Sequence, residues 1–330
     1  AYVMGSLLNL SVYAEDGKIV NKAVEKAFNE AERLDMLMSN YKNDSELSRV
    51  NSNAIYKHIT CDNELLYIIE ESLRYSEITA GAFDITVFPL VNVWGFFRNF
   101  NGNITGNIPT SKELQEILPA VSYINILINI NNSSENNEST IFLKNRYTQI
   151  DLGGIGKGYT VDMVSKTLQM EGIAVALVDF AGNICAFGSP PGRDKWAVGI
   201  KDPTNINSII GSFKIKDTAV STSGNYEKFF VKDGKRYAHI IDPRTGNPVS
   251  GVLSVTIMAD TAMEADALST GIFVMGTDKG FTLLENLENV EGIMIFEDEE
   301  SHIAVKKSKG FTETLELNNI DAKWRILESD

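Results

Sequence analysis

Apolar side chains recur at three- and four-residue intervals in several stretches of the chain. The pattern is clearest over residues 22–39, where apolar positions repeat with helical spacing from Ala23 to Met38. This spacing predicts an amphipathic helix of about five turns. The same reasoning predicts helices at residues 62–78, with Asp62 as the N-cap, and at 157–170, 261–275 and 278–287.

Short runs rich in β-branched and aromatic residues alternate with these helices and predict strands, among them residues 6–14, 175–180, 227–231, 236–241 and 253–259. The Asp-Gly pair in VKDGKR tolerates the positive φ angles of a tight turn, so it predicts a hairpin between 227–231 and 236–241. Because the strands are grouped in hairpins, we predict an α+β fold rather than a doubly wound sheet. We expect one domain over residues 1–330, with two closely packed subdomains as the alternative.

Composition and charge narrow the class of protein. The chain has 330 residues, of which 43% are hydrophobic and 22% charged, which is ordinary for a globular protein. Its formal net charge is −14 and no basic stripe is visible, so nucleic acid is not expected as a partner. Cys61 and Cys185 are too few for a disulfide framework. No apolar run reaches the roughly 18 to 20 residues of a membrane span.

The segment RYAHIIDPRTG, residues 236–246, holds one of three histidines. It predicts a strand through Ile241 followed by a polar turn from Asp242 to Gly246. His239 is therefore either a structural residue bonded to a backbone carbonyl or a general base at the mouth of a site. The segment alone leaves both roles open.

A glycine cluster occurs in QIDLGGIGKGYTVD, residues 149–162, with Lys157 at the expected start of a helix. Glycines let a backbone turn sharply and approach a ligand, and the free N–H groups of a helix start suit a phosphate. The spacing fits neither a Walker A loop nor a dinucleotide fingerprint. A tight strand-to-helix turn without a ligand is the alternative. The glycines are Gly153, Gly154, Gly156 and Gly158.

Three further stretches carry polar groups that suit a site. In MEADALSTG, Asp266 and Thr270 are four residues apart, so a helix would place them on one face, where their oxygens suit Mg²⁺. A solvated helix face is the alternative. In GAFDITVF, Asp84 stands among apolar residues, either as a hydrogen-bonded structural acid or as a ligand-binding group. STSGNY, residues 221–226, predicts a hydroxyl-rich turn that holds a phosphate or only caps the turn.

Taken in order, these motifs resemble the ApbE family, the FAD:protein FMN transferases. The resemblance covers nearly the whole chain. It begins at Met4-Gly5-Ser6 and continues through MLMSNYKNDSELSRVN, GAFDITVFPLVNVWGF, DLGGIGKGYTVD, STSGNYEKFFVKDGKRYAHIIDPRTGNP and SVTIMADTAMEADALSTGIFVMG. Any one of these motifs is weak evidence, whereas six in register are strong.

The resemblance implies a T-fold-like α+β fold and a specific reaction. Family members use Mg²⁺ to split FAD, pass FMN to a Ser or Thr hydroxyl of a target protein, and release AMP. His239 would be the base, and the Gly154 carbonyl, Asp266 and Thr270 would hold Mg²⁺. The flavin nucleotide would be contacted by Met4, Tyr41, Ala82, Phe83, Asp84, Asp151, Lys157 and Ile241.

The resemblance also implies a location on the extracytoplasmic face of a bacterial cytoplasmic membrane, as a periplasmic or cell-surface lipoprotein whose signal segment is absent from this chain. One departure concerns the fold: Ala181 replaces the first of two glycines usual in the family, and alanine adopts a positive φ less readily. Two other activities stay open, an Mg²⁺-dependent FAD pyrophosphatase that releases free FMN and a flavin-binding protein without catalysis.

Overall fold

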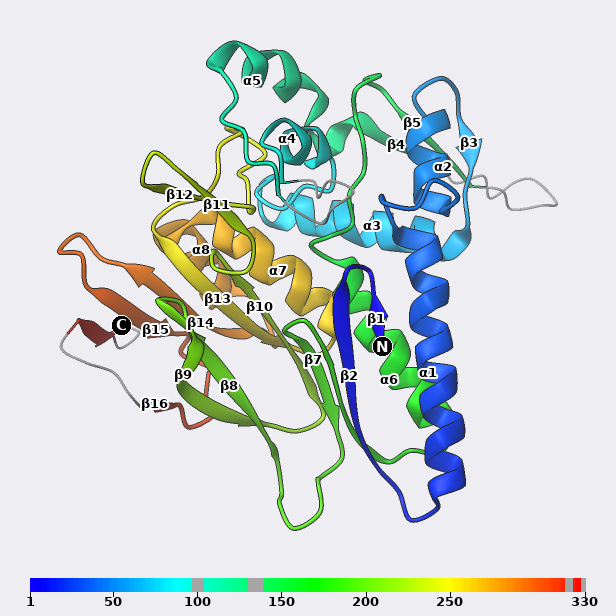
Figure 1. Ribbon diagram of the computed structural model, residues 1–330, viewed down its shortest axis with the longest axis vertical. Helices are drawn as coiled ribbons and strands as arrows, with labels where there is room; N and C mark the ends of the chain where they lie inside the picture. Colours follow the sequence, from blue (N-terminus) through cyan, green and yellow to red (C-terminus); the bar gives the residue numbers. More distant parts are fainter. Residues whose placement is uncertain (97–103, 130–138, 318–322, 328–330) are drawn as a thin grey trace. The chain divides into compact units, whose positions relative to one another are not determined.

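The chain divides into two compact units in the computed structural model, which describes residues 1–96, 104–129, 139–317 and 323–327 (Figure 1). Unit 1 comprises Ala1–Leu34, Ile155–Tyr226 and Ser250–Asp330, and unit 2 comprises Asp35–Gly154 and Glu227–Val249. The glycine cluster therefore spans a boundary, because the chain leaves unit 2 at Gly154 and enters unit 1 at Ile155.

Unit 1 is built on a large, mainly antiparallel sheet. In the described part of the chain its strand order is β1-β2-β6-β7-β10-β13-β14-β15-β17, and only the last pair is parallel. The strands are β1 (Tyr2–Val3), β2 (Ser6–Tyr13), β6 (Val175–Phe180), β7 (Asn183–Phe187), β10 (Thr218–Gly224), β13 (Val252–Ala259), β14 (Glu291–Glu297), β15 (Ile303–Lys307) and β17 (Trp324–Leu327).

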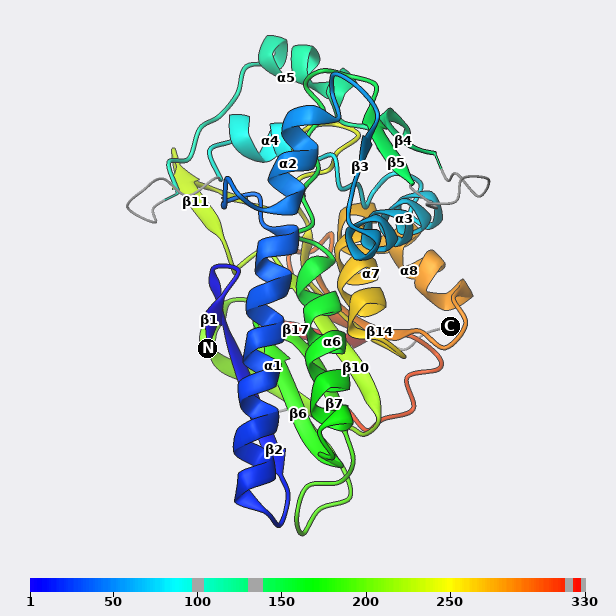
Figure 2. The same ribbon diagram turned by 90° about the vertical axis from the view of Figure 1, so that its right-hand side faces the viewer.

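Helices cover one face of this sheet. Figure 2 shows α1 (Gly17–Met38) and α6 (Gly156–Met170) running beside the strands β2, β6 and β7. Alanines at positions 23, 27 and 31 of α1 are fully buried, and they pack in one cluster with Val161, Val164 and Leu168 of α6 and with Phe180 of β6. The helices α7 (Ala262–Met275) and α8 (Thr277–Asn286) follow β13, and α7 packs on β10 and β13.

The opposite face of the sheet packs against a second, smaller sheet of β8 (Trp196–Asp202), β9 (Asn205–Ile215) and β16 (Glu316–Leu317). Strand alternation explains how β10 joins both cores. Ala219 packs into the helix-side cluster, whereas the next residue, Val220, packs with Trp196 and Phe213 on the other side. The sheet is thus buried on both faces around β10.

Unit 2 contains short elements: α2 (Glu46–Asn53), α3 (Asn63–Ile78), α4 (Phe88–Val93), α5 (Ser111–Ile117), the sheet β3-β5-β4 and the hairpin of β11 (Phe229–Lys232) and β12 (Lys235–Ala238). The three strands of the sheet are β3 (Ile59–Thr60), β4 (Ile126–Asn129) and β5 (Thr140–Leu143). Leu90, Trp94 and Ile241 share one apolar cluster, and Trp94 Nε1 donates a hydrogen bond to the Gly246 carbonyl at 2.7 Å. The turn after His239 is therefore tied to α4.

The predicted α+β class is confirmed, as are the five predicted helices, with ends that differ by up to five residues. Asp62 caps α3 as expected, because its side chain accepts a hydrogen bond from Glu64 N. The predicted turn at 221–226 is wrong in its first part, since Ser221–Gly224 belongs to β10. None of the helices in the described ranges has the length and hydrophobicity needed to cross a bilayer.

Candidate functional site

Four of the predicted site residues lie in unit 1, namely Met4, Lys157, Asp266 and Thr270. Thr160 Oγ1 of α6 lies 3.7 Å from the sulfur of Met4 in the β1–β2 turn. Gly158 N of the same helix donates to Asp266 of α7 at 2.9 Å, and the charge of Lys157 acts on Asp266. The contacts join residues more than 100 positions apart, so this half of the site depends on the tertiary fold.

Asp266 is a buried acid, and few groups of the protein offset the cost of burying its charge. Its residue is 4% exposed, and one hydrogen bond, from Gly158 N, reaches its carboxylate among the described residues. Burial raises its pKa, and the nearby charge of Lys157 and the Gly158 bond partly oppose this rise. The alternative of a solvated helix face is therefore wrong. A buried carboxylate of this kind is stabilised by a bound cation.

Hydroxyl groups surround the same part of α7. Thr270 Oγ1 lies 3.2 Å from Ser223 Oγ of β10, and Ser223 Oγ lies 2.9 Å from Ser269 Oγ. The donor set is thus a carboxylate with hydroxyls, all of them hard oxygens, which fits Mg²⁺. The described residues contain no group of three or more His, Cys, Asp or Glu arranged for a metal. Gly154 belongs to unit 2, so the three-residue ligand set stays a prediction.

The glycine cluster serves helix packing where α6 begins. A Cβ on Gly158 would lie 2.2 Å from the Ala262 carbonyl oxygen and 2.7 Å from Asp266 Cβ. Neither Gly156 nor Gly158 has a positive φ, and both lie inside α6. The expected sharp turn is therefore wrong for these two glycines. Gly158 instead lets α7 approach α6 closely enough for its N–H to bind Asp266.

Asp162 is a site residue that the sequence reasoning missed. Its two carboxylate oxygens accept hydrogen bonds from the N–H groups of Ala262 and Met263, at 2.8 and 2.9 Å, where α7 begins. Burial is the main cause that raises the pKa of Asp162 to about 6, and the two bonds oppose it. Asp162 thus holds the first turn of α7, and with it Asp266. No local pattern marks a carboxylate that caps a helix 100 residues away.

Asn183 is a second missed residue, in the strand next to β10. It is 2% exposed, and its Oδ1 has no hydrogen-bond partner among the described residues. Its Nδ2 points to the Phe180 carbonyl at 3.4 Å, and its register partner is Ser221. An unsatisfied buried acceptor costs free energy unless a donor reaches it. Asn183 therefore extends the polar lining of this part of the sheet.

The predicted flavin contacts of unit 2 lie in tightly bonded turns. Asp84 accepts three hydrogen bonds, from Thr86 N, Thr86 Oγ1 and Tyr123 N, at 2.8, 2.6 and 2.7 Å. Burial raises its pKa, and these three bonds oppose the rise. This favours the structural alternative for its carboxylate, and a contact with flavin stays a prediction. Asp151 Oδ1 similarly accepts from Gly153 N at 2.7 Å.

The other predicted contacts of unit 2 differ in exposure. Ala82, Phe83 and Ile241 are buried, so a ligand would reach mainly their backbone. Phe83 packs edge-on against Tyr75, with ring centroids 6.5 Å apart. Tyr41 is 60% exposed, which leaves much of its ring accessible. Their roles toward flavin stay predictions.

His239 follows β12 directly, and its geometry defines its tautomer. Its Nδ1 lies 3.1 Å from the Lys228 carbonyl oxygen, and its backbone N donates to the same oxygen at 3.0 Å. A carbonyl oxygen only accepts, so Nδ1 carries the proton and Nε2 is the acceptor in the neutral ring. The bond expected of a structural histidine is thus present at Nδ1, and the general-base role stays a prediction. In the turn beyond, Asp242 pairs with Arg244.

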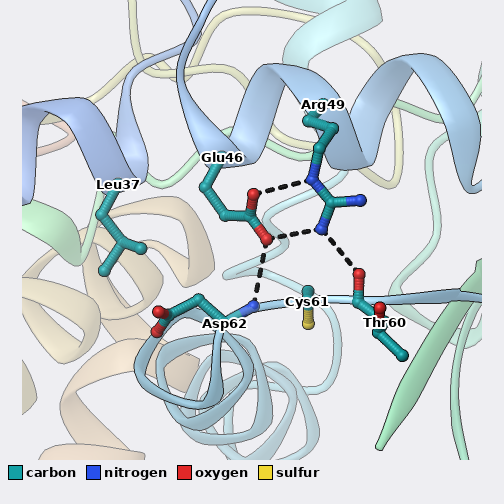
Figure 3. A pocket seen from close by; sticks show the side chains of 6 residues that line it. All are labelled: Leu37, Glu46, Arg49, Thr60, Cys61 and Asp62. Carbon is teal, nitrogen blue, oxygen red and sulfur yellow. Dashed lines mark hydrogen bonds and ion pairs between the residues drawn. The ribbon is translucent and has the colours of Figure 1, made fainter.

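Unit 2 also holds a cavity of about 380 Å³, shown in Figure 3. It is lined by Leu37, Glu46, Arg49, Thr60, Cys61 and Asp62, none of which is a predicted site residue. Its polar groups bind one another, since Arg49 donates to Glu46 at 2.8 and 2.6 Å and to the Thr60 carbonyl at 2.6 Å (Figure 3). Burial raises the pKa of Cys61 to about 11, so its thiol is protonated at neutral pH. We therefore do not assign chemistry to this cavity.

Comparison with known proteins decides the family. A family model described as "ApbE family" matches residues 4–294. The chain belongs to the ApbE family. It is 33% identical over 287 residues to the FAD:protein FMN transferase of Vibrio cholerae, a match that covers 86% of this chain and 82% of that protein. The FAD:protein FMN transferase of Treponema pallidum is 33% identical over 341 residues, covering 99% and 90%.

Solved ApbE structures share the fold. The crystal structure of the ApbE protein from Thermotoga maritima matches with a TM-score of 0.83 and 30% identity, covering 94% of this chain and 96% of that one. The flavin transferase ApbE from Vibrio cholerae matches with a TM-score of 0.80 and 30% identity over the same shares. The family predicted from the ordered motifs is thus confirmed.

Proposed function

We propose that this ApbE-family chain is an FAD:protein FMN transferase that uses Mg²⁺ to move FMN from FAD to a Ser or Thr hydroxyl of a target protein. The names and coverage of the relatives support the transferase activity. The observation that carries the metal-dependent form is Asp266, a buried carboxylate beside the Thr270 hydroxyl cluster and the first turn of α6. A non-catalytic flavin carrier would need neither this carboxylate nor a base.

In this reaction an oxygen–phosphorus bond forms between the acceptor hydroxyl and the FMN phosphate. The pyrophosphate bond of FAD breaks, and AMP leaves. Asp266 and Thr270 would hold Mg²⁺, which would supply positive charge against the phosphate oxygens, and the Gly154 carbonyl is the third ligand that the family resemblance implies. Lys157, in the first turn of α6, would add a positive charge where the N–H groups of the helix start suit phosphate.

His239 would supply the base. An alcohol is a poor nucleophile until its proton is removed, and a base of neutral pKa suits that step. Because Nδ1 is bonded to the Lys228 carbonyl, Nε2 would accept the hydroxyl proton while the ring stays oriented. The Lys228 bond is thus part of the mechanism, since it sets both the tautomer and the direction of the ring.

The test is incubation of the protein with FAD, Mg²⁺ and a candidate acceptor domain, followed by intact mass. We expect the acceptor to gain the mass of one FMN and AMP to appear in equal amount. Free FMN and AMP without labelled acceptor, across a broad panel of acceptors, would show a pyrophosphatase instead. FAD bound but unchanged would show a carrier.

We also propose, from the family resemblance, that the protein acts on the extracytoplasmic face of a bacterial membrane. The support is the family resemblance. Fractionation of the native host, with an antibody against this chain, tests it. Recovery with cytoplasmic markers would contradict the location without affecting the proposed reaction.

A further inference from the structure

The β11–β12 hairpin is locally basic in an acidic chain. Residues 228–236 carry four cations and one carboxylate, Asp233, although the whole chain has a net charge of −14. The cations are Lys228, Lys232, Lys235 and Arg236, and all four are exposed. The search for a basic stripe in the sequence did not consider a group of cations as short as this hairpin.

Aromatic side chains fix one face of this hairpin to the body of unit 2. Phe230 and Tyr237 are register partners and stack with centroids 5.1 Å apart. Phe230 also packs on Phe96 at 5.3 Å, and Tyr237 packs on Trp94 at 5.6 Å. These ring contacts thus hold the hairpin in place against unit 2, and they fix the positions of the backbone that carries its cations.

The cations toward the tip have no carboxylate partner among the described residues. Lys232 and Lys235 are register partners, so two like charges stand opposite each other, an arrangement that costs free energy. Arg236 lies over the ring of Phe229 at 4.2 Å, and Lys235 lies 5.3 Å from the centre of the Tyr237 ring. The register places Lys232 and Lys235 on the face of Tyr237 and Arg236 on the face of Phe229, so both faces of the hairpin tip carry cations. Cations of this kind are complementary to an acidic partner.

The hairpin leads directly to the predicted base. His239 follows β12, and its N–H and ring both bind the carbonyl of Lys228, the residue before β11. Arg236 is three residues from His239, about 10 Å along an extended chain. Each strand has one edge that pairs with no other strand in the described ranges. An extended segment lying on the hairpin would therefore bring a hydroxyl to His239.

We propose that the β11–β12 hairpin is the docking surface for the target protein, and that it binds an extended acidic segment flanking the accepting Ser or Thr. The proposal rests on the proposed transferase function, because it concerns the protein acceptor of that reaction. The spacing from Lys235 and Arg236 to His239 places the acidic residues within about four positions of the hydroxyl.

Direct binding tests this surface without requiring transfer. Two fluorescent synthetic peptides are compared by anisotropy at low salt: one with a central Thr flanked by Asp and Glu, the other with Asn and Gln in their place. We expect the acidic peptide to bind roughly 10-fold more tightly and to lose this preference at high salt. The double variant Lys235→Glu/Arg236→Glu should abolish the preference.

The matched control is Lys201→Glu/Lys214→Glu, which makes the same charge change on exposed lysines of the β8–β9 hairpin in unit 1. The control should keep the preference, and thermal unfolding shows that both variants fold. Equal binding of the two peptides by the wild type, or equal loss in both variants, would overturn the proposal. The proposal would also be overturned if Lys235→Glu/Arg236→Glu lost binding to anionic phospholipid vesicles but kept the preference for the acidic peptide. If the acidic peptide binds as expected while no acceptor gains FMN, the transferase function fails and the docking surface stands.

Discussion

Two buried acids, one in each unit, differ in how far the protein's own hydrogen bonds compensate their charge. Asp84 in unit 2 and Asp266 in unit 1 are both almost fully buried, and burial raises the pKa of each. Asp84 accepts three hydrogen bonds, from residues 86 and 123. Asp266 accepts one among the described residues. The protein's own hydrogen bonds therefore compensate Asp84 more fully than Asp266, which is why we propose a cation at Asp266.

The same contrast extends to the surrounding residues. In unit 2, Asp84 and Asp151 each bind an N–H group two residues ahead, as in a local turn, and Asp84 also binds Tyr123 N, 39 residues away. In unit 1, Asp162 and Asp266 bind N–H groups about 100 residues away. Both acids of unit 1 are thus held by long-range bonds. We therefore expect Asp266→Asn to affect the reaction more than the matched change Asp84→Asn.

The largest difference should appear between Asp266→Asn and Asp84→Asn. Asp266→Asn keeps an oxygen for Gly158 N but removes the charge that holds the metal, so transfer should fall about 10³-fold or more. Mg²⁺ should raise the melting temperature of the wild type and not of this variant. Asp84→Asn should instead lose about 1–3 kcal/mol of stability through an unsatisfied donor. FMN transfer and thermal unfolding with and without EDTA measure both effects, and full activity of Asp266→Asn would remove the metal assignment.

The next effect concerns His239→Asn. We expect transfer to fall by about 10²- to 10⁴-fold while FAD still binds, because the base is lost and the remaining contacts stay. Asparagine can still donate to the Lys228 carbonyl, so the strand end should be preserved. His58→Asn and His302→Asn are the controls and should be nearly silent, since His58 stacks on Phe142 and His302 lies near Asp298, both outside the family motifs. Loss of FAD binding by His239→Asn would make the residue a pocket wall.

Helical and strand periodicity predicted most elements of the fold, because apolar spacing reflects burial on one face. It missed α2, whose polar sequence ELSRVNSN buries only Leu47 and Val50. It also missed that STSG in β10 is a strand, since serine and threonine resemble turn residues when their partners are unknown. Those partners are Ser269 and Thr270, about 47 positions later.

The candidate site, like the fold, could be predicted from the sequence only in part. Helical spacing predicted that Asp266 and Thr270 share one face of a helix, and the ordered motifs identified the family. The metal role of the two residues came from the family resemblance and stays a prediction. Asp162 and Asn183 could not be found, because their roles depend on α7 beginning beside α6 and on β7 lying beside β10. Contacts between distant segments have no local signature in one sequence.

The third prediction compares two glycines of the cluster, Gly158 in unit 1 and Gly153 in unit 2. Gly158→Ala would place a Cβ 2.2 Å from a backbone carbonyl of α7, so it should destabilise the fold by about 3 kcal/mol and impair metal binding. Gly153→Ala would meet the side chain of Asp151, with Oδ1 at 3.0 Å and Cγ at 3.8 Å. This side chain can shift, so the change should cost less than about 1 kcal/mol. Urea unfolding of both variants measures the difference. Equal stability would show that the approach of α6 and α7 is not close in solution.

The smallest expected effect concerns two hairpin turns that share a pair of positive φ angles. The β6–β7 turn has Ala181 at φ 53° and Gly182 at 88°, and the β11–β12 turn has Asp233 at 53° and Gly234 at 75°. Two positive φ angles are those of a type I′ turn, in which aspartate is tolerated and alanine is strained. Ala181→Gly relieves that strain but adds freedom to the unfolded chain, so we expect a net gain of about 0.5–1 kcal/mol.

The reciprocal change, Asp233→Ala, places the strained residue in unit 2 and should lose about 1 kcal/mol. Both are read from chemical unfolding at fixed pH. The doubt that Ala181 raised about local geometry is settled by the structure, since the turn forms and its neighbour Gly182 N donates to Asp179 Oδ1 at 3.1 Å. If Ala181→Gly stabilises the protein yet lowers transfer, the strain at this turn positions Asn183 for the reaction. If it stabilises without any change in transfer, the strain is only a stability cost at the edge of the unit 1 site.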